Sequence, residues 1–207
     1  MSAGGDLQER GPLAEEDAAR ANLYALIGRL FYDAPDSILL AQLRRGEGEP
    51  SGSSQPLDQA WSALRDACGS AYPVVVKQEY DTLFIGVGRS EVTPYTTHYL
   101  KGHSPEQHLV RLRERLGSLG LGRRDAAYEM EDHVSGLCDV MRVLIEEGHA
   151  LSEQMQFFNE FVYPCVKPFC DAVGTATSAV FYRHVAQFLG AFLEVERQAF
   201  EMIEPGG

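Results

Sequence analysis

The sequence lacks the features that stabilise small secreted domains or carry a chain into a membrane. Its four cysteines contain no C-x-x-C pair, and a chain of 207 residues does not need disulfides, so we interpret them as reduced, mostly buried thiols. The first 20 residues have neither a basic start nor an apolar stretch, so we expect no signal peptide. No apolar run approaches the ~18 residues of a membrane span. Together these absences predict a cytoplasmic protein.

Positive charge is also scarce. Eighteen Lys and Arg residues stand against 30 Asp and Glu, which gives a net charge of −12. Sequence-independent binding of nucleic acid needs clustered cations to neutralise phosphates, so DNA and RNA are excluded as expected partners. An acidic surface instead attracts a basic partner. Hydrophobic residues make up 44% of the chain, which is enough for a folded core.

The common catalytic motifs are absent. There is no G-x-S-x-G nucleophile elbow and no phosphate-binding G-x-x-x-x-G-K-[ST] loop. The segment 86–88 is G-x-G alone, which favours a turn over a dinucleotide site. Three histidines, His98, His103 and His108, lie close together, but they lack the tight spacing of zinc ligands and favour surface or structural roles. We therefore predict no enzyme, no metal ion and no cofactor.

Asp132 and His133 are a more informative pair. Neighbouring residues on a helix do not face each other, so the two do not form an acid–base dyad. One interpretation is that Asp132 serves a helix N-terminus while His133 packs or bonds locally. The other is that both help to line a polar patch that receives a ligand.

Apolar residues follow helical spacing through most of the chain, and no segment shows a convincing strand period. Asp36 and Ser104 are placed to cap helices, and Pro164 is placed to end one. The spacing predicts helices over 23–31, 36–43, 57–67, 73–85, 104–117, 134–148, 155–162 and 180–199. We expect a single all-α domain over 1–207, a helical bundle of about eight or nine helices. Residues 1–13 are predicted to be a flexible tail and residues 44–56 a mobile loop rich in Gly, Ser and Pro.

Four short segments resemble motifs of one family, the TorD/DmsD/NarJ-type chaperones. Residues 79–88 resemble its E-Y-x-x-L-F-x-G-x-G motif, and residues 94–99 its P-Y-x-S-x-Y stretch, with Thr97 in place of Ser. Residues 129–133 resemble its E-P-x-D-H motif, with Met130 in place of Pro, and the segment from Phe181 to Glu196 resembles its final helix. The family's H-L-x-x-W stretch falls on 161–165, where both His and Trp are missing. The resemblance covers the chain from about Ala21 to Glu196.

The resemblance implies a cytoplasmic, non-catalytic chaperone for molybdenum- or tungsten-cofactor oxidoreductases. Such chaperones bind the apo catalytic subunit, often at its twin-arginine signal peptide, until the cofactor is inserted. The resemblance leaves open whether the chain is a monomer or a dimer. Carried over by motif position, the implied client-binding residues are Tyr80, Leu83, Phe84, Pro94, Tyr95, Tyr99, Glu129, Glu131, Asp132 and His133.

The physical chemistry of these residues agrees with that role. A twin-arginine leader presents two guanidinium groups and then an apolar segment, so its receptor needs carboxylates and a lipophilic surface. Glu129, Glu131 and Asp132 supply the carboxylates, and Phe84, Tyr95 and Tyr99 are candidates for the contact surface. Two alternatives stay open: a helical adaptor that shares only the fold, and a metal- or nucleotide-dependent enzyme built on Asp132 and the histidines.

Overall fold

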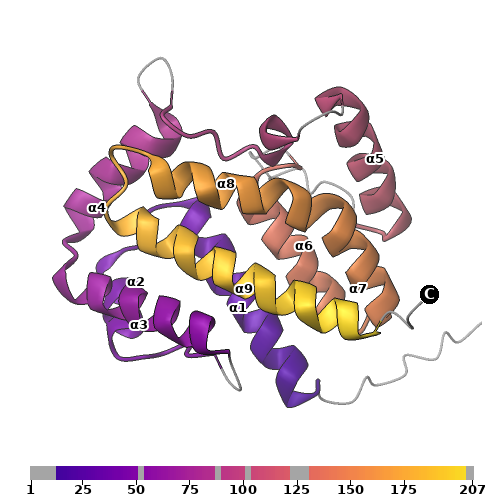
Figure 1. The fold of residues 1–207 in the computed structure, drawn as a ribbon, viewed down its shortest axis with the longest axis horizontal. Helices are drawn as coiled ribbons and strands as arrows, with labels where there is room; N and C mark the ends of the chain where they lie inside the picture. The colour runs from indigo at the N-terminus through magenta and orange to yellow at the C-terminus, as the bar shows by residue number, and fades with distance from the viewer. Residues whose placement is uncertain (1–12, 51–53, 87–89, 101–103, 122–130, 204–207) are drawn as a thin grey trace, which may run out of the picture.

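A computed structural model describes residues 13–50, 54–86, 90–100, 104–121 and 131–203 (Figure 1). Within these ranges the all-α prediction is confirmed, because the regular structure consists of helices and the β-type pairing is one isolated bridge. The α-helices are α1 (Glu15–Tyr32), α2 (Ser37–Arg44), α3 (Gln55–Ser70), α4 (Pro73–Tyr80), α5 (Pro105–Ser118), α6 (Val134–Glu146), α7 (Leu151–Phe157), α8 (Tyr163–Thr175) and α9 (Phe181–Ile203). The short turns are η1 (Asp81–Ile85) and η3 (Phe158–Val162), both π-helical, and the 3-10 turn η2 (Thr96–Tyr99).

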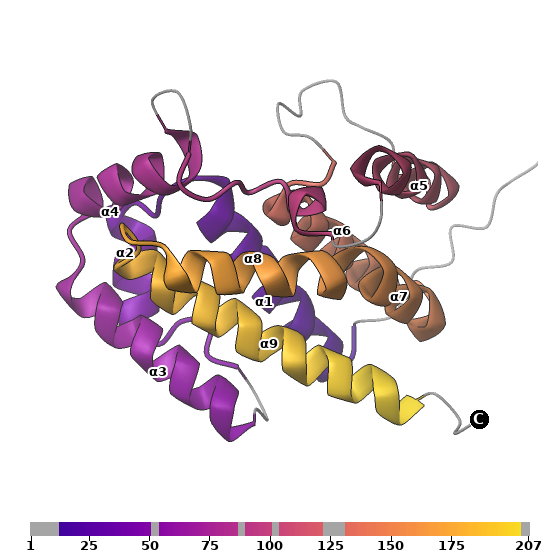
Figure 2. The ribbon, with the colours of Figure 1, turned by 45° about the horizontal axis from the view of Figure 1, so that its top comes forward.

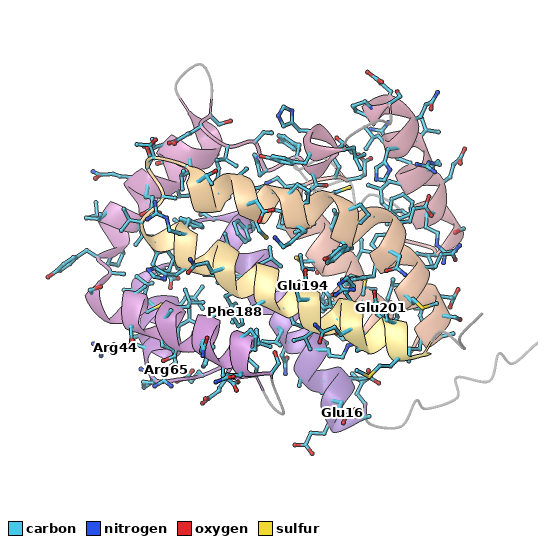
Figure 3. The ribbon with its side chains drawn as sticks, viewed as in Figure 1. Glu16, Arg44, Arg65, Phe188, Glu194 and Glu201 are labelled. Carbon is cyan, nitrogen blue, oxygen red and sulfur yellow. The ribbon has the colours of Figure 1, made fainter. Side chains whose placement is uncertain are left out.

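Helix α9 is the long axis around which the other helices assemble. It packs against α3 on one side and α8 on the other, and α1 packs along α6 behind them (Figures 1 and 2). Its buried face carries Phe188, whose ring lies 5.3 Å from that of Trp61 on α3 (Figure 3). Within the described part of the chain, no helix has the length and hydropathy to cross a membrane.

Local sequence signals explain several helix ends. Asp36 caps α2, since its carboxylate accepts from the Leu39 amide at 2.8 Å, and Ser104 accepts from the Gln107 amide at 3.4 Å at the start of α5. Gly86 ends η1 with a φ of 63°, a conformation that favours glycine. The predicted tail lies outside the described residues except for Leu13. The predicted loop is described at 44–50 and 54–56, and α3 begins inside it at Gln55.

The predicted helix end at Pro164 is wrong. The chain passes from α7 through the π-turn η3 directly into α8, for which the apolar pattern predicts no helix. Pro164 lies in the first turn of α8, where a backbone N–H has no partner within the helix, so its missing donor is tolerated. The π-turn shifts the hydrogen-bond register just before the proline. Pro164 therefore lies at the start of a helix and not at the end of one.

Aromatic rings from four segments fill the centre of the core. Phe31 of α1, Phe84 of η1, Phe169 of α8 and Tyr182 of α9 contact one another, with ring centroids 5.1–6.2 Å apart. All four side chains are buried. Such rings bury large apolar areas and fix the relative orientation of the elements that carry them. This cluster joins the first predicted motif, through Phe84, to the last, through Tyr182.

Candidate functional site

Residues 93–99 form a strap that lies across the start of α6. The Thr96 amide and hydroxyl both donate to the Asp132 carbonyl at 2.9 Å, and the Val134 amide donates to the Pro94 carbonyl at 3.0 Å. Tyr95 and His133 make an isolated antiparallel bridge. These bonds bring together the P-Y and D-H motifs, which are more than 30 residues apart in the sequence.

Asp132 is the buried charge of this site, with 2% of its surface exposed. Its Oδ2 atom accepts a short hydrogen bond from the Thr97 hydroxyl and a longer one, 3.4 Å, from the Thr97 amide. Its Oδ1 atom is buried and has no hydrogen-bond partner among the residues that the structure describes. A buried carboxylate normally uses most of its acceptor sites, so Oδ1 can accept a further donor.

His133, rather than Asp132, caps α6. Its Nδ1 accepts from the Ser135 amide at 3.2 Å and lies 2.6 Å from the Ser135 hydroxyl. The His133 ring also packs edge-on against Tyr95, with 5.5 Å between the centroids. His133 therefore bonds locally, as one interpretation of the pair expects, whereas Asp132 does not serve the N-terminus of α6 as that interpretation also expects.

A buried thiol lies beside Asp132. The Cys165 sulfur is 3.8 Å from His108 Nε2, and His108 Nδ1 is 3.4 Å from an Arg111 guanidinium nitrogen. Burial, with a smaller contribution from the negative charge of Asp132, raises the pKa of the Cys165 thiol to about 12. Cys165 therefore stays protonated at neutral pH, which makes it a poor nucleophile.

The histidines named in the sequence do not gather. His98 is exposed on the strap, His108 is buried on α5, and His103 lies outside the described residues. Searching the described ranges finds no group of three or more His, Cys, Asp or Glu side chains arranged to hold a metal ion.

The remaining strap residues are half-buried or buried. The Tyr99 hydroxyl donates to the Thr93 carbonyl at 2.9 Å, and burial raises the pKa of Tyr99 to about 12. Its ring lies 5.9 Å from Phe169 of the aromatic core, while Pro94 is buried and Tyr95 is half-buried. Tyr95 and Tyr99 are thus the aromatic residues of the strap that keep exposed surface.

The carboxylates predicted around Asp132 are separated and largely paired. Glu131 lies 3.3 Å from the Arg113 guanidinium, and Glu129 is outside the described residues. Farther along α6, Asp139 and Glu146 both bind Arg142. Of these carboxylates, Asp132 therefore has a buried oxygen for which the described part of the chain supplies no donor.

The first predicted motif lies in the core, away from the strap surface. Tyr80, Leu83 and Phe84 are each at most 5% exposed. The Tyr80 hydroxyl donates to the Tyr32 carbonyl at 2.8 Å and thereby satisfies one of the last carbonyls of α1. The link to the strap is indirect, because Phe169 contacts both Phe84 and Tyr99.

The model of the nitrate reductase delta subunit family matches residues 51–194, more than half of the chain. The chain belongs to this family. Members of the nitrate reductase delta family are non-catalytic chaperones of molybdoenzyme maturation, so the chain is a chaperone of this kind and not an enzyme. A comparison with curated proteins found no match. The matched range includes the strap and Asp132, and it begins after α1 and α2.

Sequence reasoning about this nitrate reductase delta family member missed two residues of the site. Thr97 is the hydroxyl donor to Asp132, and Phe169 supports the strap from α8. The Thr97 position carried a signal, because Ser is usual there in the related motif and both side chains offer a hydroxyl. Phe169 had no such signal in the sequence, since it lies in α8, the helix that the apolar spacing did not predict.

Replacing Thr97 with valine is expected to destabilise the protein by about 1–3 kcal/mol, because Asp132 would keep only the long bond from the Thr97 amide. Thr97→Ser preserves the hydroxyl and is expected to stay within about 0.5–1 kcal/mol of the native protein. Urea denaturation of the three proteins measures both changes. Equal stabilities for the valine and serine variants would show that the Asp132 bond contributes nothing.

Proposed function

We propose that the chain is a cytoplasmic chaperone that binds the apo catalytic subunit of a molybdenum- or tungsten-cofactor oxidoreductase. It binds the twin-arginine leader of that subunit and holds the protein until the cofactor is inserted. Membership of the nitrate reductase delta family supports the general role. The resemblance of the four motifs to those of TorD/DmsD/NarJ-type chaperones supports the part of the proposal that concerns the leader and export proofreading.

The observation that carries this proposal is the Oδ1 atom of Asp132, which is buried and has no hydrogen-bond partner within the described ranges. A buried carboxylate oxygen without a donor costs free energy, and an arriving guanidinium group offers charged N–H donors that recover it. The two N–H groups of one arginine side chain could bind the Asp132 carboxylate together, because Thr97 donates to only one of its two oxygens. Access requires the strap to move at Thr97, because Asp132 is covered in this structure.

The surroundings of Asp132 suit a cationic and apolar ligand. Tyr95 and Tyr99 are partly exposed on the strap, two residues on either side of Thr97, which binds the Asp132 carboxylate. The net charge of −12 attracts a basic segment at long range. Arginine recognition by Asp132 and apolar contact by the strap tyrosines together fit a twin-arginine leader.

Titration calorimetry against the leader of the molybdoenzyme encoded nearest the gene tests the proposal. We expect micromolar or tighter binding that weakens when Lys-Lys replaces Arg-Arg, because lysine lacks the planar fork of arginine. Asp132→Asn is expected to weaken binding about tenfold or more, since it removes a buried charge partner. Asp139→Asn is the matched control, because Asp139 is exposed on α6 and paired with Arg142.

If a stably folded Asp132→Asn variant bound the leader with unchanged affinity, the leader would have to bind at another site. The chain could instead bind neither leader and still capture the mature apo subunit. That result would confine the interaction to the stage of cofactor insertion. Absence of binding to both the leader and the apo subunit would contradict the proposed function.

A further inference from the structure

An ion pair joins α5 to the residue that precedes Asp132. The Arg113 Nε atom lies 3.3 Å from Glu131 Oε1, and its Nη2 atom lies 3.3 Å from Glu131 Oε2, so both carboxylate oxygens are engaged. This is the two-pronged geometry in which arginine binds a carboxylate. One of the chain's own guanidinium groups therefore already occupies the carboxylate next to Asp132.

The pair between Arg113 and Glu131 is long and partly solvated. Charge-assisted hydrogen bonds of this kind are usually about 2.7–2.9 Å long. The bonds of the buried pair between Arg20 and Glu196 have these lengths, 2.7 and 2.9 Å. The Arg113 side chain is 51% exposed and that of Glu131 is 17% exposed. Because solvated pairs contribute little to stability, an arriving guanidinium group can displace Arg113 at a small cost.

Helix α5 has other contacts that hold it at the edge of the molecule (Figures 1 and 2). Three of its side chains are buried: His108, Leu112 and Leu116. Arg111, on the same helix, pairs with Glu160 of η3 at 3.5 Å. The Arg113 side chain can therefore leave Glu131 and enter solvent while α5 stays in place.

We infer that Arg113 is an autoinhibitory residue, which occupies Glu131 in the unliganded chain and competes with a cationic client segment for that carboxylate. The inference rests on the proposed function for the ligand and for Asp132 as its first contact. An arginine bound at Asp132 brings its neighbour in the leader close to Glu131. That neighbour gains an ion pair only by breaking the one that Arg113 makes. The affinity is therefore lower than two new ion pairs would give, and the return of Arg113 to Glu131 favours release of the client.

Titration calorimetry of the full chain with the Arg-Arg leader peptide tests the competition. Arg113→Gln is expected to bind the peptide about threefold more tightly than Arg111→Gln, because the cost of displacing the internal guanidinium is gone. Arg111→Gln is the matched control, since Arg111 lies on the same helix, is also 51% exposed and pairs with the Glu160 carboxylate. Both variants change the net charge equally. Thermal unfolding checks that both are folded.

Salt dependence and a second substitution distinguish competition from a structural effect. Peptide binding to the native chain breaks one ion pair and forms two, whereas binding to Arg113→Gln forms two and breaks none. The affinity of Arg113→Gln is therefore expected to fall more steeply with ionic strength. In a Glu131→Gln background, Arg113→Gln is expected to change the affinity no more than Arg111→Gln does. Equal affinities of Arg113→Gln and Arg111→Gln, or the same gain with and without the Glu131 carboxylate, would overturn the inference.

The autoinhibition and the proposed function fail separately. If Asp132→Asn weakens peptide binding while Arg113→Gln and Arg111→Gln bind alike, Arg113 does not compete and the proposed function is unaffected. If neither the native chain nor Arg113→Gln binds the peptide, the autoinhibition is refuted, and capture of the apo subunit decides the proposed function. If Arg113→Gln binds the peptide more tightly through Glu131 but the chain captures no apo catalytic subunit, the role in maturation is refuted and the competition remains.

Discussion

Replacing Glu196 with alanine is expected to destabilise the protein by about 3–5 kcal/mol, because it breaks a buried ion pair. Glu196 is 2% exposed on α9. Its two carboxylate oxygens accept from the Arg20 guanidinium at 2.7 and 2.9 Å, and the Tyr24 hydroxyl donates to it at 3.0 Å. The three side chains join the first helix to the last across 176 residues of sequence.

The cost comes mainly from the groups left behind. Tyr24 is fully buried, so its hydroxyl would lose its acceptor without gaining water. Burial and the nearby Glu196 carboxylate raise the pKa of Tyr24 well above its usual value, so the hydroxyl remains a donor at any ordinary pH. Arg20 would keep its bond to Asp17, at 3.0 Å, and its contact with the Phe200 ring, 5.5 Å from the centroid. A charged group and a buried hydroxyl would both be incompletely satisfied.

Urea denaturation monitored by circular dichroism measures this change. Glu201→Ala is the matched control on the same helix, because Glu201 is exposed and pairs with Arg197 (Figure 3). Exposed pairs contribute about 0–1 kcal/mol, so the control is expected to differ little from the native protein. The double change Arg20→Met/Glu196→Leu is expected to recover most of the loss. A cost below about 1 kcal/mol for Glu196→Ala would show that the buried pair does not hold α1 to α9.

Replacing Glu79 with alanine is expected to cost about 2–3 kcal/mol. The Glu79 carboxylate accepts from three successive amides at the start of α9, those of Val180 at 2.9 Å, Phe181 at 3.0 Å and Tyr182 at 2.8 Å. The first amides of a helix have no partner within it, and a negative charge there also favours the helix dipole. One side chain from α4 thus caps the longest helix of the fold.

Thermal and urea unfolding of Glu79→Ala and Glu79→Gln test this prediction. Glutamine keeps one acceptor oxygen and loses the charge, so it is expected to recover about half of the cost. Glu91→Ala is the control, because the exposed Glu91 carboxylate accepts from the Thr177 and Ser178 amides of the neighbouring turn. Its solvent exposure makes a smaller effect expected, below about 1 kcal/mol. An equal cost for Glu79→Ala and Glu91→Ala would contradict the capping role.

The contacts of Glu79 and Tyr80 give the E-Y dipeptide of the first motif a role in stability that does not require client binding. Glu79 satisfies donors at the start of α9, and Tyr80 satisfies a carbonyl at the end of α1. Adjacent residues therefore tie the end of α1 and the start of α9 to α4. The structure supplies a stabilising role for a motif that the family resemblance associates with client binding.

Most of the helices could be predicted because their signals are local. Apolar residues at three- and four-residue spacing mark the buried side of α1, α6 and α9, and Asp36 and Ser104 cap the helices that follow them. The absence of strand periods determined the all-α class. The order of the four motifs indicated a TorD/DmsD/NarJ-type family, and the match over 51–194 supports this as far as the nitrate reductase delta family.

Burial and pairing were decided by the tertiary structure. The partners of Glu196, Glu79 and Asp132 are 35 to 176 residues away, and no periodic pattern records such a distance. The prediction at Pro164 was wrong because the π-turn η3 shifts the hydrogen-bond register just before the proline, and α8 then begins. This shift is stabilised by packing and not by helix propensity. The sequence by itself determined most of the helical segments, with α8 as the exception, since helix formation depends largely on neighbours along the chain. Which motif residues form the core and which form the site depended on contacts between helices.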